Sequence, residues 1–143
     1  MEYPITAIIR QDGLRLFFVH TAELPAPLAQ HARMFSYTAL GGCGQWRIAL
    51  TEACAIRLAA ELSACRAQEA HGLWSRFTLY GIGIRRQGDI IGRLLAVFRQ
   101  TDATAELVNA SEEGVSFLLP EGVAESMFHR LCRVFPLTVW PDG

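Results

Sequence analysis

Two segments with helical periodicity, each entered directly from a strand pattern, constrain the fold of this chain more than any other feature of the sequence. The first is 52–70, which is rich in Ala, Leu, Glu and Arg and follows Thr51, a favourable N-cap residue. Its apolar side is formed by Ala55, Leu58, Leu62 and Cys65. The second is 121–134, where Pro120 fits the first turn of a helix. These two helices, set between strands, predict a mixed fold.

Strand patterns fill most of the remaining chain. A hairpin turn signal at 12–13 predicts that strands 3–9 and 14–20 form an N-terminal hairpin. Residues 73–86 and 90–99 predict a second, longer antiparallel hairpin. Further strands are expected at 34–37, 45–50, 104–108, 115–119 and 137–140.

The order of the elements from residue 45 onward is β-α-β-β-β-β-α-β, and Pro25 and Pro27 predict an irregular loop over 22–33. This order resembles the ferredoxin-like split βαβ arrangement, with an added N-terminal hairpin. We therefore expect an α+β fold in which two helices cover one face of a mainly antiparallel sheet. The length of 143 residues is typical of one domain, so 1–143 is expected to be a single domain.

The two strand–helix junctions, 48–52 and 117–121, resemble each other. In register, Leu50, Glu52, Ala55 and Leu62 match Leu119, Glu121, Ala124 and Leu131. The match is explained either by a duplicated strand–helix unit or by the general preferences of such junctions, since Glu is favoured in the first turn of any helix. On the sequence alone we favour the general explanation.

The net charge and the spacing of the cysteines limit the classes of function that the sequence favours. The net charge is −1, and all thirteen basic residues are Arg, so the chain is lysine-free and lacks a bulk attraction for nucleic acid or anionic membranes. The sequence has no apolar run of about 18 residues and begins without a signal-peptide pattern, so we expect a cytoplasmic protein. No CxxC pair is present, so we expect reduced thiols, no metal and no cofactor. The four cysteines are Cys43, Cys54, Cys65 and Cys132.

A charge-polarised surface is the main candidate site. The predicted 76–99 hairpin is rich in arginine, and an acidic stretch follows it at 102–125. Such polarity favours electrostatic steering of a protein partner, or self-association as a homodimer. We therefore expect a non-enzymatic protein-binding module, of the adaptor, immunity-protein or phage or mobile-element inhibitor type. The candidate binding residues are Arg76, Arg85, Arg86, Arg93, Arg99, Tyr80, Glu112 and Glu113.

Two alternatives remain open. The same hairpin interleaves arginines with aromatic residues, which is typical of domains that bind single-stranded nucleic acid. The second alternative is a cysteine-dependent enzyme centred on Cys43, which lies in a glycine-rich turn, with His129 as a candidate base.

The segment 109–115 has the sequence Asn-Ala-Ser-Glu-Glu-Gly-Val. It resembles the Asn/Asp-x-Ser-x-x-Gly element of PilZ domains, which bind cyclic di-GMP. That family also needs an upstream Arg-x-x-x-Arg, which has no counterpart in 76–99. Because Asn, Ser and Gly are also the residue types of ordinary turns, we expect a turn here.

Overall fold

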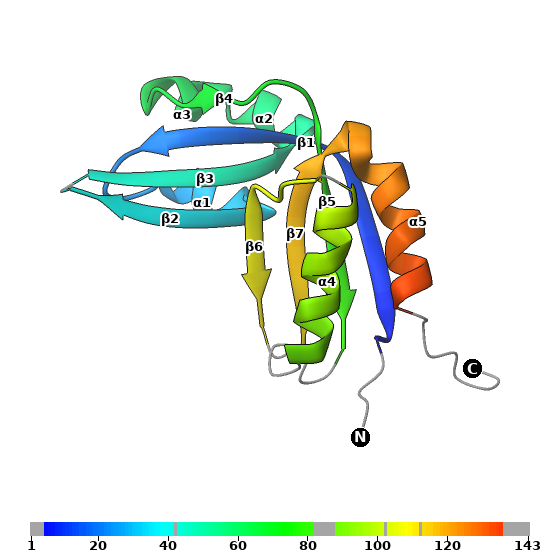
Figure 1. The fold of residues 1–143 in the computed structure, drawn as a ribbon. Helices are drawn as coiled ribbons and strands as arrows, with labels where there is room; N and C mark the ends of the chain where they lie inside the picture. The colour runs from blue at the N-terminus through cyan, green and yellow to red at the C-terminus, as the bar shows by residue number, and fades with distance from the viewer. Residues whose placement is uncertain (1–4, 42, 82–87, 102, 112, 136–143) are drawn as a thin grey trace. The chain divides into compact units, whose positions relative to one another are not determined.

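A computed structural model describes residues 5–41, 43–81, 88–101, 103–111 and 113–135 (Figure 1). The chain divides into two compact units. We call Asp12–Trp74 the inserted unit, because it interrupts the other one. The split unit consists of Met1–Gln11 and Ser75–Gly143. The single-domain organisation stays a prediction.

The inserted unit is an antiparallel sheet with short helices, and its strand order is β2-β3-β1-β4. Its core contains Phe17 and Val19 of the first strand, Leu28 of the first helix, and Ile48 and Leu50 of the third strand. The elements are the second half of β1 (Ala7–His20), α1 (Ala26–His31), β2 (Met34–Leu40), β3 (Cys43–Thr51), α2 (Glu52–Arg57), α3 (Ala59–Ala64) and β4 (Gln68–Glu69).

Two predictions for the inserted unit are wrong in detail. The expected loop over 22–33 contains α1, because a proline is tolerated at the start of a helix, where its missing N–H is not needed. The expected helix over 52–70 begins as predicted, with Thr51 Oγ1 accepting a hydrogen bond from Cys54 N at 3.2 Å. It is interrupted at Leu58, and the chain leaves the helical conformation again at Arg66, whose φ is +54°.

The strands of the split unit follow the order β1-β5-β7-β6. β5 and β7 run antiparallel, because Gly81 N, beyond the end of β5, donates to Glu113 O, just before β7 begins. The core under the helices includes Phe77, Leu94, Phe117 and Leu131. The elements are the first half of β1, β5 (Trp74–Tyr80), α4 (Gly88–Thr101), β6 (Leu107–Ala110), β7 (Gly114–Pro120), the 3₁₀ turn η2 (Glu121–Val123) and α5 (Ala124–Val134).

The two predicted hairpins are also wrong. Residues 90–99 lie in helix α4, and Ile90, Leu94 and Val97 are buried at helical spacing. The Arg-rich 76–99 segment is therefore a strand followed by a helix, while 82–87 lies outside the described residues, as does the strand expected at 137–140. At the N-terminus, β1 runs through the expected turn, with Gly13 at a φ of +73°.

The chain is α+β with a mainly antiparallel sheet and a ferredoxin-like order, as the sequence predicted. Both units follow the same pattern of strand, helix, two strands, helix and final strand, and in the split unit the first half of β1 supplies the final strand. The junctions β3–α2 and β7–α5 thus occupy equivalent positions. Three of the four matched pairs are buried, whereas Glu52 is exposed and Glu121 half-buried. The buried pairs are Leu50 and Leu119 at 0 % exposure, Ala55 and Ala124 at 3 % and 0 %, and Leu62 and Leu131 at 7 % and 0 %.

A bidentate ion pair joins β4 to β1 in the inserted unit. Arg15 Nε and Nη2 each lie 2.7 Å from a carboxylate oxygen of Glu69. The hydrogen bonds from Arg15 lower the pKa of Glu69, although burial opposes this shift.

We expect Glu69→Gln to lower the free energy of unfolding by less than about 1 kcal/mol at neutral pH, because the pair is partly exposed to solvent. The pKa of Glu69 is lowered on folding, so its contribution is present above the ordinary glutamate range and is lost as the pH falls through the folded pKa. Urea unfolding at a series of pH values tests this. The difference between wild type and variant should shrink in acid, whereas the exposed-site control Glu23→Gln should change little at any pH.

Candidate functional site

The face of the split-unit sheet opposite α4 and α5 carries a polar row. Strand geometry alternates side chains, so Phe77 and Leu79 of β5 pack into the core while Thr78 and Tyr80 point to the other face. On the neighbouring strands, Asn109 of β6 pairs with Ser116 of β7 and extends the row.

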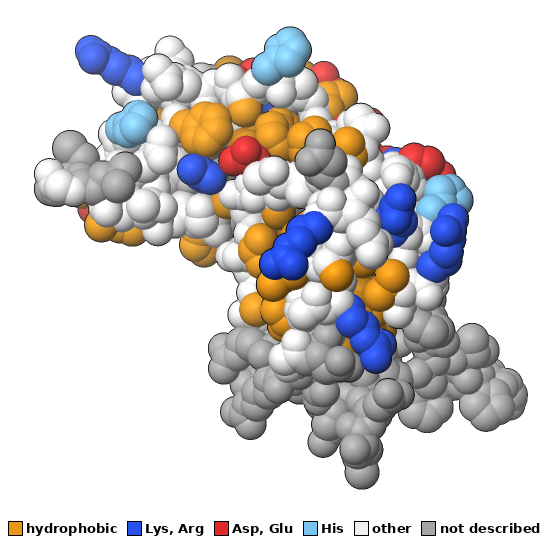
Figure 2. Space-filling view, in the orientation of Figure 1, with side chains coloured by type: hydrophobic (Ala, Val, Ile, Leu, Met, Phe, Trp, Pro, Cys, Tyr) orange, Lys and Arg blue, Asp and Glu red, His pale blue; other side chains and the backbone are white. Residues whose placement is uncertain are grey.

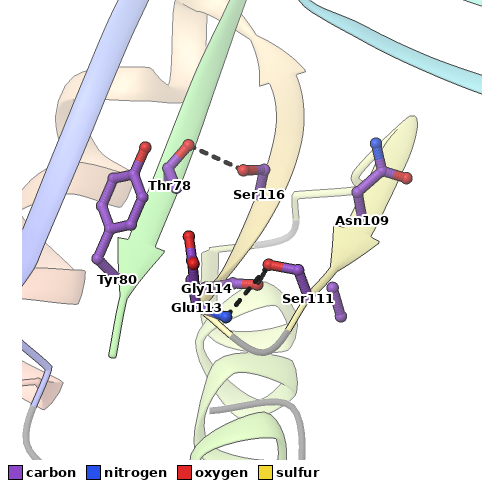
Figure 3. A pocket seen from close by; sticks show the side chains of 8 residues that line it. Thr78, Tyr80, Asn109, Ser111, Glu113, Gly114 and Ser116 are labelled. Carbon is purple, nitrogen blue, oxygen red and sulfur yellow. Dashed lines mark hydrogen bonds between the residues drawn. The ribbon is translucent and has the colours of Figure 1, made fainter. Parts of the chain in front are cut away.

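This row lines a pocket of about 220 Å³, which we call the sheet pocket (Figure 3). The hydroxyls of Thr78 and Ser116 lie 2.9 Å apart and hydrogen-bond to each other across β5 and β7. Figure 3 shows Tyr80 on one side of the pocket and Asn109 on the other, with Glu113 between them. The lining residues are Thr78, Tyr80, Asn109, Ala110, Ser111, Glu113, Gly114 and Ser116.

A tight turn between β6 and β7 positions Glu113 at the pocket. Ser111 N donates to Gly114 O at 2.8 Å, and Glu113 N donates to the hydroxyl of Ser111 at 3.3 Å. The carbonyl of Glu113 accepts a hydrogen bond from Gly81 N at 2.8 Å, which ties the turn to the end of β5. The Asn-x-Ser-x-x-Gly segment therefore forms a turn in a ferredoxin-like sheet, as expected from its residue types.

The side chains that line the sheet pocket are mostly polar and can form hydrogen bonds with a ligand. Among the described residues, the lining offers hydroxyls, one amide and the carboxyl group of Glu113, and it offers no cationic side chain. This set favours a small ligand that carries a positive charge or several hydrogen-bond donors. No group of three or more metal-ligating side chains was found in the part of the chain that the structure describes.

The structure separates the residues that we proposed from the sequence. Tyr80 and Glu113 line the sheet pocket. Arg76 lies on β5, two residues before the lining residue Thr78. Arg93 and Arg99 lie on α4, which packs on the core side of the same sheet. Arg85, Arg86 and Glu112 fall outside the described residues.

The cysteine alternative stays a prediction. Cys43 is the first residue of β3 in the inserted unit, and nothing is described of its side chain. His129 lies on α5 of the split unit, with Nε2 at 3.1 Å from Glu125 Oε1. Glu125 also accepts a hydrogen bond from Arg10, and this contact is the main reason why the pKa of Glu125 is lowered.

Several solved structures with a similar fold are aspartate kinases or their regulatory subunits. The ligand-free regulatory subunit of aspartate kinase from Thermus thermophilus superposes with a TM-score of 0.74 at 14% identity, covering 92% of this chain and 99% of that one. The chain shares the fold of aspartate kinase regulatory subunits. These are ACT-like domains with the βαββαβ order of ferredoxin-like folds.

Two further structures extend the comparison. Aspartate kinase from Synechocystis gives a TM-score of 0.72 at 13% identity, covering 100% of this chain and 29% of that one. A Vibrio cholerae protein of unknown function, VC0802, described as a possible transport protein, gives 0.59 at 13% identity, with 89% of each chain covered. No protein-family model and no curated protein matches the sequence. Among the described residues, no helix is long and apolar enough to cross a membrane.

Proposed function

We propose that the chain is a non-enzymatic regulatory module that binds a small polar ligand in the sheet pocket. The observation that carries this proposal is the convergence of polar groups from three strands on one hollow, with Glu113 as the only acidic side chain among the described lining residues. Because a carboxylate forms strong, charge-assisted hydrogen bonds with a cationic donor, we expect the ligand to carry an ammonium group.

The fold supports a regulatory role. The neighbours from Thermus are regulatory subunits of aspartate kinase, and E. coli aspartokinase III has been solved with lysine and aspartate bound. At 14% identity for the Thermus chains the likeness shows the fold alone, so the choice of ligand for this chain depends on its own pocket. Lysine and aspartate are useful probes because they differ in net charge.

We also propose a protein partner, through which a ligand-dependent change would be transmitted. A related arrangement is found in aspartokinase, which has been solved as α and β subunits. The adaptor, immunity-protein and inhibitor types remain specific forms of this proposal, as does a homodimer.

The test is thermal unfolding in the presence of single amino acids and small diamines, followed by calorimetric titration of any compound that raises the Tm. A ligand that binds the folded state raises its stability by mass action. We expect a compound with an ammonium group to bind, and Glu113→Gln to weaken its affinity by about tenfold or more, because a charge-assisted hydrogen bond is lost.

Glu23→Gln is the matched control, since it removes one carboxylate from an exposed position in the inserted unit. Its affinity for the same compound should equal that of the wild type. The proposal is wrong if no compound of the set raises the Tm, or if the two variants lose the same affinity.

A further inference from the structure

Helices α4 and α5 form a basic layer over the core of the split unit. From Ile90 to the end of α4 the only charged residues are Arg93 and Arg99, and from Ser126 to the end of α5 they are Arg130 and Arg133. The two helices pack together, and Arg130 Nη1 lies 3.4 Å from Gln100 Oε1. Figure 2 shows arginine side chains gathered over these helices.

Two of these arginines, Arg99 and Arg133, are available to a partner. Arg99 and Arg133 are exposed and form no ion pair with the described residues, and the hydrogen bond that Arg130 donates goes to a neutral amide. The nearby carboxylate of Glu125 is already bound by Arg10 and His129. From the sequence, Arg93 and Arg99 were expected on a hairpin. Arg130 and Arg133 were not predicted to be near them, because the packing of α4 with α5 was not foreseen.

The surface also offers an apolar contact beside an arginine. Leu95 is 48% exposed on α4, and Gly92 and Ala96 are small exposed residues of the same helix. Leu95 and Arg99 are four residues apart, so they lie on the same face of α4. A short acidic segment can therefore contact Leu95 while one of its carboxylates reaches the guanidinium group of Arg99.

We propose that α4 and α5 are the docking surface for an acidic segment of a protein partner. Charge complementarity carries this inference, because guanidinium groups bind carboxylates in bidentate geometry. A protein is favoured over nucleic acid because Phe98 and Phe128, the aromatic side chains of these helices, pack against the core and offer no exposed stacking platform. The exposed Leu95 adds an apolar contact of the kind found at protein interfaces.

The experiment measures binding of a dye-labelled decaglutamate peptide to the full chain by fluorescence anisotropy at low and moderate salt. We expect Arg99→Glu with Arg133→Glu to weaken binding at least about tenfold, because two attractive contacts become repulsive. Circular dichroism and the Tm of each variant verify that it is folded, and Arg99→Gln with Arg133→Gln should give an intermediate affinity.

The control is Arg57→Glu with Arg66→Glu, two exposed arginines of the inserted unit, which changes the net charge by the same amount. Its affinity should stay within about twofold of the wild type, once the shared change in net charge is allowed for. Equal losses in the two double variants would overturn the proposal. It would also be overturned if a single-stranded decathymidylate, measured in parallel, bound more tightly than the peptide and with a steeper dependence on salt.

Discussion

Leu119→Ala and Leu50→Ala should each lower the free energy of unfolding by about 2–5 kcal/mol, because each removes a fully buried side chain and leaves a cavity. The two leucines occupy equivalent positions, at the ends of β7 and β3 just before a helix. If the units arose from one repeated architecture, the two substitutions should have similar effects, although they act on separate cores.

Urea unfolding followed by circular dichroism measures both losses, and hydrogen exchange shows where protection disappears. We expect one cooperative transition and loss of protection in both units for each variant, because β1 contributes residues to both units. Two separate transitions, each moved by only one substitution, would instead show independently unfolding units. Ile56→Ala is the control, since Ile56 is 65% exposed and its truncation should change the stability by no more than about 0.5 kcal/mol.

Gly114→Ala should lower the free energy of unfolding by about 1–3 kcal/mol, since overpacking forces the backbone to move. A Cβ at this position would lie 2.6 Å from the carbonyl oxygen of Leu79, so β5 and β7 would have to separate. The same displacement would disturb Thr78 and Ser116, so ligand binding in the sheet pocket should weaken as well.

Gly92→Ala is the matched substitution, and we expect it to raise the free energy of unfolding instead of lowering it. Gly92 lies in α4, and a Cβ there would have no heavy atom within 4 Å. Alanine is favoured over glycine in a helix by roughly 0.5–1 kcal/mol, so this variant should be more stable than the wild type. Chemical denaturation of both variants measures the change in the free energy of unfolding relative to the wild type. Equal stability of Gly114→Ala and the wild type would contradict the close packing of β5 on β7.

The sequence predicted the class of the fold because its strongest local signals agree with the structure. Thr51 caps α2, and α5 begins close to the predicted start of the second helix. α4 was missed because Ile90 to Arg99 is an apolar run whose spacing is compatible with either a strand or a helix, and only the packing of Leu94 and Val97 on the sheet decides between them.

The N-terminal turn signal failed for a different reason. Asp-Gly favours a turn in isolation, but here the residues on both sides of Gly13 pair with other strands, so tertiary pairing overrides the local preference. The candidate site was only partly predictable for the same reason. Tyr80 and Glu113 were named from their sequence context, whereas Thr78 and Ser116 meet across strands that are 38 residues apart in the sequence.

The interruption of the split unit by the inserted unit also sets an order for folding during synthesis. The inserted unit is contiguous, so all its strands are available as soon as β4 has left the ribosome. The first half of β1 is made before it, yet its neighbour β5 emerges only afterwards. The first half of β1 therefore cannot pair with β5 until more than sixty further residues have been translated. Slow translation beyond β4 would prolong the period in which the apolar side chains of this first half are exposed to chaperones.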